Sequence, residues 1–324
     1  SKLFENHFTL PNLYISSRLK KYMAAMRFLH YTILNWMKLI KNTPKIWIKK
    51  FPWKKKSSNK YSRGRVLILG GQKNMIGATI LAAEACLRVG VGSVKIICTK
   101  ETIQTLSIKF PSALKIEINN ISYLKSFLKK ERKTTSVALV GPGAGNNAKT
   151  MKYTEEILKH IKYVILDADA LNSFQHRTKK LLKYLDEYKL ITPHKAEFQR
   201  LFPSIENSLE NKEKVFKFLR LCKSNILLKG NTTLIGSNET IIKNSHSSSE
   251  LAVIGSGDVL AGIITSLVGD NKMSVLEAAS AGAWLHGDIS KKHGKGLISE
   301  DLIKGIPLAL KRLKNEWIIK QRNS

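Results

Sequence analysis

The stretch Gly64–Cys98, GRVLILGGQKNMIGATILAAEACLRVGVGSVKIIC, decides the fold class of this chain. It begins with a short aliphatic run, Gly64 to Gly71, that predicts a buried strand ending in a glycine loop. A segment rich in small residues follows and predicts a helix that lies close to a sheet, and the run SVKIIC predicts a second strand. A strand, a helix and a strand within about 35 residues are typical of a parallel crossover unit. The sequence therefore predicts an α/β fold.

The same alternation continues toward the C-terminus. Residues 136–147 and 163–172 each predict a strand that ends in a glycine-rich or acidic loop. The segment KLITPHKAEFQRLF predicts a strand and a helix start, NILLKGNTTLIGSNETIIKN predicts a strand and a hairpin, and the chain beyond Asp258 is predicted helical. Because the carboxyl ends of parallel strands face one crevice of an open sheet, we expect the loops after these strands to converge there.

A second stretch, Leu251–Leu267 (LAVIGSGDVLAGIITSL), indicates the chemistry. Gly255, Ser256 and Gly257 carry little or no side chain, so their N–H groups can bind an anion at the positive end of the following helix. Asp258 follows in the first turn, where we expect the helix dipole to keep its carboxylate ionised. A carboxylate beside an anion-binding turn can take the proton of an alcohol while the turn holds a phosphoryl group. The pair predicts a hydroxyl-phosphorylating site; the alternative is an aspartate that serves only the helix terminus.

Composition narrows the class of protein. A chain of 324 residues, 43% of them hydrophobic, can bury a full core without crosslinks. Cys86, Cys98 and Cys222 are odd in number, far apart and set in apolar runs, which argues against a disulfide framework and a metal cluster and predicts a reducing, cytoplasmic setting. No uncharged apolar run reaches about 18 residues, so no membrane span is predicted.

The net charge of +31, from 55 basic and 24 acidic residues, is unusual. The excess is concentrated in the first 64 residues, where Glu5 is the only acidic side chain. Such a charge suits nucleic acid, because lysine and arginine gain affinity for phosphate through counterion release. The lysines are scattered and no nucleic-acid motif is present, so we do not expect a nucleic-acid partner; a compositional bias or attraction for small polyanions explains the charge.

The N-terminal segment is predicted to be separate from the catalytic domain. Residues 1–41 form a basic extension in which Arg18 to about Lys41 predicts an amphipathic helix, and residues 42–324 form the domain. A helix packed on the domain, a membrane-surface helix and a presequence remain open.

Several motifs occur together in the order of a known family: GRVLILGG, GATILAAEACLRVGVGSV, VGPGAG, LDADALN, TPHKAEF, LLKG and GSGDVLAGII. Their order and separations closely resemble those of the ADP- or ATP-dependent NAD(P)H-hydrate dehydratases, from about Asn42 to about Lys314. The resemblance implies a ribokinase-like αβα sandwich around a mostly parallel central sheet. Other ribokinase-like kinases share single motifs such as GSGD, whereas the whole set in register is specific.

The resemblance implies a hydro-lyase that repairs nicotinamide nucleotides. The family's substrate is the (6S) hydrate of NADH or NADPH, whose hydroxyl is phosphorylated at the expense of ADP or ATP and then eliminated as phosphate. A magnesium ion is expected, held mainly by nucleotide and water, so no set of protein metal ligands is predicted. Asp167 and Asp169 are the acids nearest in kind to such a role, and for Asp167 we favour a polar turn.

The resemblance also assigns residues. Asp258 would be the catalytic base and a substrate contact, with Gly255, Ser256 and Gly257 holding the phosphoryl group. The nucleotide would contact Lys229, Gly230, Asn231, Thr232, Thr233 and Gly257, and the hydrated substrate would contact Ala78, Gly145 and His194. The alternative interpretations are a solvated lysine at position 229 and a capping or packing histidine at position 194.

Three features depart from the family pattern. Lys195 and Ala196 stand where the family has Pro-Gly, Ile254 stands where it has Gly or Ala, and NSHSSSELAV lacks the usual glycine and proline. We expect these changes to affect substrate fit more than the fold. By family resemblance we also expect a homo-oligomer, a tetramer, and a functional pairing with an NAD(P)H-hydrate epimerase, for which residues 1–40 are too short.

Two other functions remain open from the sequence. One is a ribokinase-like kinase of a small vitamin-precursor alcohol, which would share the GSGD turn. The other is an inactive nucleotide-binding or nucleic-acid-binding relative, which Ile254 and the basic N-terminal segment would suit.

Overall fold

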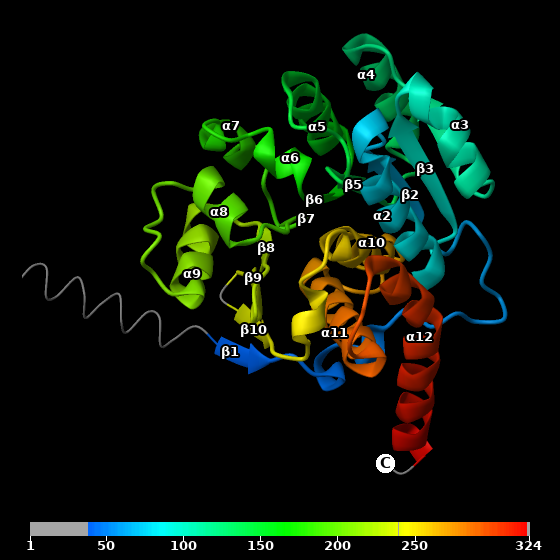
Figure 1. Ribbon diagram of the computed structural model, residues 1–324, viewed down its shortest axis with the longest axis vertical. Coiled ribbons are helices and arrows are strands. Elements are labelled where there is room, and N and C mark those ends of the chain that lie inside the picture. Colours follow the sequence, from blue (N-terminus) through cyan, green and yellow to red (C-terminus); the bar gives the residue numbers. More distant parts are fainter. Residues whose placement is uncertain (1–37, 239, 323–324) are drawn as a thin grey trace, which may run out of the picture. The chain divides into compact units, whose positions relative to one another are not determined.

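A computed structural model describes residues 38–238 and 240–322 (Figure 1). From Leu39 onward the residues group into one compact unit, built on a ten-stranded sheet with the order β1-β10-β9-β8-β7-β6-β5-β2-β3-β4. The predicted α/β fold is confirmed. The strands are β1 (Lys38–Lys41), β2 (Arg65–Leu69), β3 (Ser93–Cys98), β4 (Leu114–Glu117), β5 (Val137–Val140), β6 (Tyr163–Leu166), β7 (Lys189–Ile191), β8 (Asn225–Leu228), β9 (Thr233–Ser237) and β10 (Thr240–Asn244).

The middle of the sheet is parallel. Val66 of β2 lies opposite Val94 of β3 and Val137 of β5, and the parallel pairing continues from β5 to β8. The last two strands form the predicted hairpin, because β9 and β10 pair antiparallel with Ile242 opposite Ile235. Strands β5 and β8 are buried at every position, as expected for strands covered on both faces.

The strand order reverses between β2 and β5. From β2 the chain moves outward through β3 to β4, and from β5 it moves the other way through β6 and β7 to β8. The loops that leave β2 and β5 therefore diverge and open a crevice at the carboxyl edge of the sheet, the usual ligand position in open α/β sheets.

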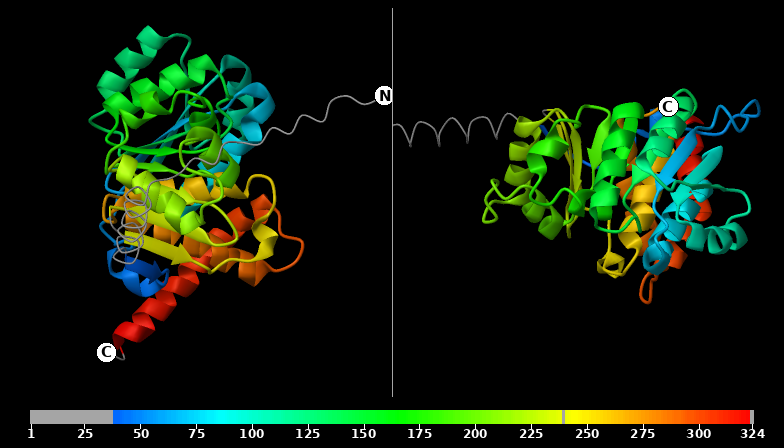
Figure 2. Two further views of the ribbon diagram at one scale, coloured as in Figure 1. Left: turned by 90° about the vertical axis from the view of Figure 1, so that its left-hand side faces the viewer. Right: turned by 90° about the horizontal axis from the view of Figure 1, so that it is seen from above.

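Helices cover both faces of the sheet. Helices α2 (Ile76–Val89), α10 (Ser256–Gly269), α11 (Val275–His293) and α12 (Ser299–Arg322) pack against one another on one face. The green helices lie on the other face (Figure 2); they include α4 (Ile121–Glu131), α5 (Ala148–His160), α6 (Asp169–Asn172), α7 (Thr178–Leu182), α8 (Lys195–Leu201) and α9 (Asn211–Leu221). Helix α3 (Lys100–Lys109) connects β3 to β4.

The small residues of α2 serve a contact between helices. A Cβ atom placed on Gly262 of α10 would lie 2.3 Å from the carbonyl oxygen of Ala82 and 2.8 Å from the Cβ of Ala85. Both alanines are fully buried. The sequence predicts that this face lies against a sheet, whereas Ala82 and Ala85 lie against α10, because Gly262 has no side chain to hold the two helices apart.

One boundary prediction is wrong. Residues Lys38–Lys41, predicted as the end of an amphipathic helix, form strand β1 beside β10; the rest of that predicted helix lies outside the described residues. Asn42, which follows β1, is buried and donates to Asn244 Oδ1 at 2.9 Å and to the carbonyl oxygen of Ser280 at 2.7 Å. In the described part of the chain, no helix is both long and apolar enough to span a bilayer.

Candidate active site

The glycine turn before α10 has the geometry of an anion-binding helix start. Gly255 precedes the helix with a φ of +87°, and a Cβ atom there would lie 2.4 Å from Leu81 Cδ1, so both backbone and space require glycine. The Ser256 amide donates to the carbonyl of Val253 at 3.3 Å. One of the three amides predicted to bind an anion is thus already engaged. Within the described residues, the amides of Gly257 and Asp258 have no acceptor.

Ile254, the residue before this turn, does not fill the site. Its side chain is fully exposed, and its carbonyl oxygen accepts a hydrogen bond from Ser299 Oγ at 2.6 Å. The bulk that departs from the family pattern therefore points away from the packed protein, while the backbone of the turn is fixed by α12.

The predicted nucleotide residues and the glycine turn face one cavity. A cavity of about 550 Å³ is lined by the segment from Lys229 to Thr233 and by Ser256 and Gly257. The rest of its wall is neutral and consists of Asn244, Ser245, Ser247, Ser248, Ser249, Leu251, Ala252, Leu260, Ala283 and His286. The structure brings together five predicted nucleotide contacts with two residues of the predicted phosphate turn.

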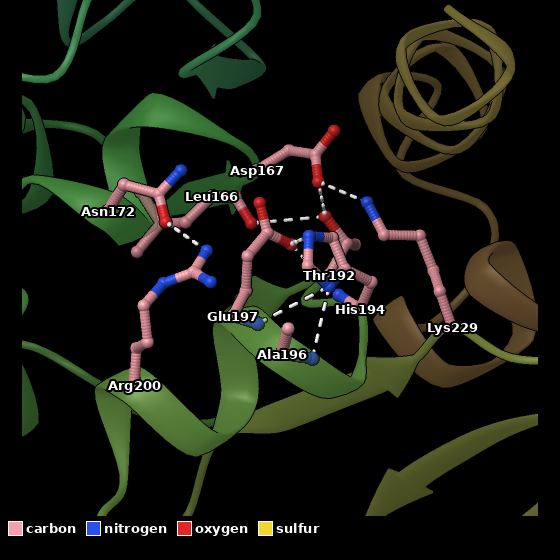
Figure 3. A network of polar contacts seen from close by, with 9 residues as sticks. All are labelled: Leu166, Asp167, Asn172, Thr192, His194, Ala196, Glu197, Arg200 and Lys229. Carbon is pink, nitrogen blue, oxygen red and sulfur yellow. Dashed lines mark hydrogen bonds and ion pairs between the residues drawn. The ribbon is translucent and has the colours of Figure 1, made fainter. Parts of the chain in front are cut away.

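Lys229, which follows β8, is held by an acid at the end of strand β6. Its Nζ lies 2.8 Å from Asp167 Oδ1, which also accepts a hydrogen bond from Thr192 Oγ1 at 2.7 Å (Figure 3). A Cβ atom on Gly257 would lie 3.4 Å from the same Nζ, so the ammonium lies beside the first turn of α10. Burial lowers the pKa of Lys229, but the charges of Asp167 and Glu197 outweigh it and the net shift is upward. The lysine is therefore charged, not an ordinary solvated one.

Asp167 is not the simple polar turn that the sequence favoured. Its side chain is 1% exposed, and its Oδ1 accepts hydrogen bonds from residues at two other strand ends, since Thr192 follows β7 and Lys229 follows β8. Ala168, which lies between Asp167 and Asp169, has a φ of +46°, which is uncommon for alanine. The loop after β6 is therefore held in a strained backbone conformation at the carboxyl edge of the sheet.

Asp258 is not held ionised as the sequence predicted. Burial, followed by the negative charge of Asp167, raises the pKa of Asp258 to about 7; Lys229 lowers it, and Asp169 and Glu197 raise it further. The helix dipole is outweighed because Asp258 is buried and the charges of three other carboxylates, against one ammonium, act on it. A carboxylate with a pKa near 7 is matched to general base catalysis at neutral pH.

Gly145 and Ala78 lie at the crevice between β2 and β5. The Gly145 amide donates to Asp169 Oδ2 at 2.8 Å, and a Cβ atom there would lie 2.4 Å from Gln72 Oε1. Ala78 is half-buried in the first turns of α2, and its neighbour Thr79 accepts from the Gly71 amide and donates to the Pro142 carbonyl. The loops after β2 and β5 are thus tied together.

His194 caps helix α8. Its Nδ1 accepts hydrogen bonds from the amides of Ala196 and Glu197 at 3.1 and 3.3 Å, and its own amide donates to Glu197 Oε2 at 2.9 Å (Figure 3). The capping role left open by the sequence is confirmed, and it forms with Lys195 and Ala196 in place of Pro-Gly. The side chain is 50% exposed. His194, Ala78 and Gly145 do not line the 550 Å³ cavity.

A family model for NAD(P)H-hydrate dehydratase matches residues 66–307. The chain belongs to this family. It is 32% identical to the ADP-dependent (S)-NAD(P)H-hydrate dehydratase of Staphylococcus aureus over 82% of this chain and 95% of that one. Bifunctional NAD(P)H-hydrate repair enzymes also match; the chain is 30% identical to that of Vibrio cholerae over 78% of its own length and 50% of the other.

Solved structures agree on the fold. A ribokinase-like superfamily protein of Enterococcus faecalis superposes with a TM-score of 0.75 at 24% identity, covering 85% of this chain and 96% of that one. The ADP/ATP-dependent NAD(P)H-hydrate dehydratase of Bacillus subtilis, co-crystallised with ATP and Mg²⁺, gives 0.70 at 23% identity, covering 86% and 99%. The predicted ribokinase-like fold is confirmed.

Sequence reasoning missed Glu197 in this dehydratase-family site. Glu197 is 6% exposed and its charge acts on both Asp258 and Lys229. The pattern His194-x-x-Glu197 after a strand is a capping-box signal, with histidine in the place of serine or threonine, and could have identified it. His286, which lines the cavity, carried no such signal because it lies inside a helix of small residues.

Across residues 38–238 and 240–322, no three histidine, cysteine or acidic side chains are placed to hold a metal ion together. Asp258 nevertheless interacts with three other carboxylates and one ammonium, and its raised pKa reflects this excess of negative charge. This donor chemistry suits a magnesium ion bound through nucleotide phosphates and water rather than by a protein cage.

Proposed function

We propose that this chain dehydrates the (6S) hydrate of NADH or NADPH to NADH or NADPH, with ADP or ATP as the phosphoryl donor. The observation that carries the proposal is the position of Asp258, which has a pKa of about 7 and lies in the first turn of α10, next to free backbone amides and the Lys229 ammonium. A base, an anion site and a cation are the groups that transfer of a phosphoryl group to an alcohol requires.

The reaction would proceed in two stages. Asp258 takes the proton of the ring hydroxyl while that oxygen bonds to the terminal phosphorus of the nucleotide and the phosphoanhydride bond breaks. The ring-nitrogen lone pair then expels phosphate, and loss of a proton from the neighbouring carbon restores the double bond. Phosphorylation is needed because hydroxide is a poor leaving group near neutral pH.

Each ligand has its own side of Asp258. The nucleotide would occupy the 550 Å³ cavity, with its phosphates at Lys229 and the Gly257 amide. The hydrated dinucleotide would lie in the crevice between β2 and β5, at Ala78 and Gly145, with His194 beyond them. A bound Mg²⁺ would neutralise phosphate charge, and Asp167 and Asp169 are the acids nearest in kind to the role of holding its waters.

The decisive experiment is an absorbance assay of NADH recovery from its purified hydrate with ADP or ATP and magnesium. Asp258→Asn should lower the rate at least roughly a hundredfold, as expected for loss of a general base. Asp301→Asn, the same change in the first turn of α12, is the matched control and should keep full activity. An unchanged rate in Asp258→Asn would remove it from the mechanism, and a stable phosphorylated alcohol without NADH recovery would favour a ribokinase-like kinase.

The proposal extends to the compartment, the partner and the oligomeric state of the protein. The cytoplasm is the proposed compartment, in keeping with the three free thiols Cys86, Cys98 and Cys222. Pairing with an epimerase is proposed by analogy with the bifunctional repair enzymes, and a homo-oligomer by family resemblance; light scattering tests the second.

A further inference from the structure

The cavity contains one polar atom that the protein leaves unused. His286 of α11 is 5% exposed and lines the cavity together with Lys229 and Gly257. Its Nε2 is buried and has no hydrogen-bond partner among the described residues. A buried polar atom without a partner lowers stability unless a ligand or water satisfies it. An atom of this kind inside a ligand cavity therefore points to the ligand.

The charge state of His286 decides what this atom can offer. Burial lowers the pKa of His286 to about 4; the Ser256 backbone acts in the opposite direction, and Lys229 lowers the pKa further. The imidazole is thus neutral near pH 7, with one N–H and one lone pair. The Ser256 backbone raises the pKa of His286, as a nearby acceptor does, so we assign the ring N–H to the Ser256 side of the ring. Because Nε2 has no partner, this N–H is on Nδ1, and Nε2 carries the lone pair.

The position of His286 along the cavity narrows the partner. Among the described residues, Lys229 is the only charged one in the cavity wall, so the phosphates belong at that end, and the neutral wall of small residues suits the nucleoside. His286 lines the same cavity as Lys229 and Ser256 and its pKa responds to both, so we assign it to the junction between the phosphates and the sugar. A lone pair there cannot bind a phosphate oxygen, but it can accept from a hydroxyl.

We propose that His286 is a positioning residue whose Nε2 accepts a hydrogen bond from a ribose hydroxyl of the adenine nucleotide. The proposal rests on the proposed function, because it requires a nucleotide in this cavity. The contact orients the sugar so that the terminal phosphate reaches the Gly257 amide and Lys229. The residue also selects a ribonucleotide over a deoxyribonucleotide.

The test is calorimetric binding of ADP, 2′-deoxy-ADP and 3′-deoxy-ADP to the full chain in the presence of magnesium. The wild type should bind at least one deoxy analogue on the order of tenfold more weakly than ADP, and the analogue identifies the hydroxyl. His286→Asn keeps a polar atom near the Nδ1 position but removes Nε2, so it should bind ADP on the order of tenfold more weakly and lose the discrimination. His286→Gln keeps an acceptor near the Nε2 position and should retain the discrimination between ADP and its deoxy analogue.

The outcomes separate this proposal from the general one. Equal binding of the three nucleotides by the wild type would overturn the role of His286 and leave the proposed function intact; this comparison needs no variant and holds even if His286→Asn fails to fold. Unchanged discrimination in a folded His286→Asn protein would overturn it as well. Failure of the wild type to bind either ADP or ATP would overturn both proposals.

Discussion

The ammonium of Lys229 and the carboxylate of Asp167 lie 2.8 Å apart, although β6 and β8, which deliver them, are not neighbours in the sheet. The pair reaches across the end of β7, where Thr192 donates the second hydrogen bond to the same Asp167 oxygen. Lys229 also lies beside Gly257, at the point where a phosphate would enter. One side chain therefore neutralises a buried acid and also lies beside the first turn of α10.

The Lys229–Asp167 pair should behave as a buried ion pair. Lys229→Met is expected to lower the free energy of unfolding by about 3 kcal/mol, because it leaves the Asp167 charge without a cation. The double variant Lys229→Met, Asp167→Asn should recover most of this loss, since the uncompensated charge is gone. Urea denaturation measures both. A cost below about 0.5 kcal/mol for the single variant would be typical of an exposed pair and would contradict this account.

Activity should depend on the ionisation of Asp258. Because its pKa is raised to about 7, kcat/KM is expected to rise about tenfold per pH unit below that value and to level off above it. Lys229 lowers the pKa of Asp258, so Lys229→Met should move the rising limb to higher pH. The measurement is a rate profile from pH 5.5 to 9. A profile flat between pH 6 and 8 would exclude Asp258 as the titrating base.

Asp258 should also make the protein less stable as the pH rises. A carboxyl whose folded pKa lies above its unfolded value binds its proton more tightly in the folded state, so stability falls as pH rises from about 4 to about 7. Asp258→Asn is then expected to be more stable than wild type by about 2 kcal/mol at pH 8, roughly half of the full-burial value because the side chain is only half-buried. At pH 4 the two proteins should unfold alike. Thermal melts at both values provide the comparison, and a less stable variant at pH 8 would refute it.

Gly255 should resist substitution for two separable reasons. Gly255→Ala meets both a φ of +87° and the Leu81 side chain 2.4 Å away. Gly296→Ala meets a φ of +82° with open space around it, so it serves as the control for backbone strain alone. Gly296→Ala should cost about 1–2 kcal/mol, and Gly255→Ala should cost more and reduce nucleotide affinity as the first turn of α10 shifts. If Gly255→Ala and Gly296→Ala lost the same amount of stability and the same amount of nucleotide affinity, the close contact with Leu81 would be unimportant.

Ile254 should be neutral despite its place before the phosphate turn. Its side chain is fully exposed and absent from the cavity wall, so Ile254→Ala is expected to change the free energy of unfolding by less than about 0.5 kcal/mol. Nucleotide affinity should stay within about twofold of wild type, a free-energy change of less than about 0.5 kcal/mol. Calorimetry and melting curves test this. A large gain in affinity would mean that the isoleucine obstructs the site.

The strands around the crevice and the hairpin were predictable because hydrophobic runs bounded by glycines specify them locally. The residues that meet at Lys229 were only partly predictable. Asp167 and Glu197 act on Lys229 only because the fold brings the ends of three strands side by side. This proximity is nonlocal, so the spacing of the residues in the sequence does not predict it. The state of Asp258 was misjudged for the same reason: a helix dipole can be inferred from sequence, whereas the sum of burial and neighbouring charges cannot.

The tight seat of Gly262 against Ala82 has a consequence for how this protein tolerates change. Helix α2 carries Ala78 near its start, and α10 carries Gly257 and Asp258. The proposed substrate side and nucleotide side of the site therefore lie on two helices that pack tightly against each other about one turn further along. A bulkier residue at this contact would move the two helices apart and lengthen the distance between the bound nucleotide and the hydroxyl that it would phosphorylate. A larger residue at position 262 would therefore be expected to lower both stability and turnover, so the spacing of the two proposed binding sides depends on a contact that lies outside the site.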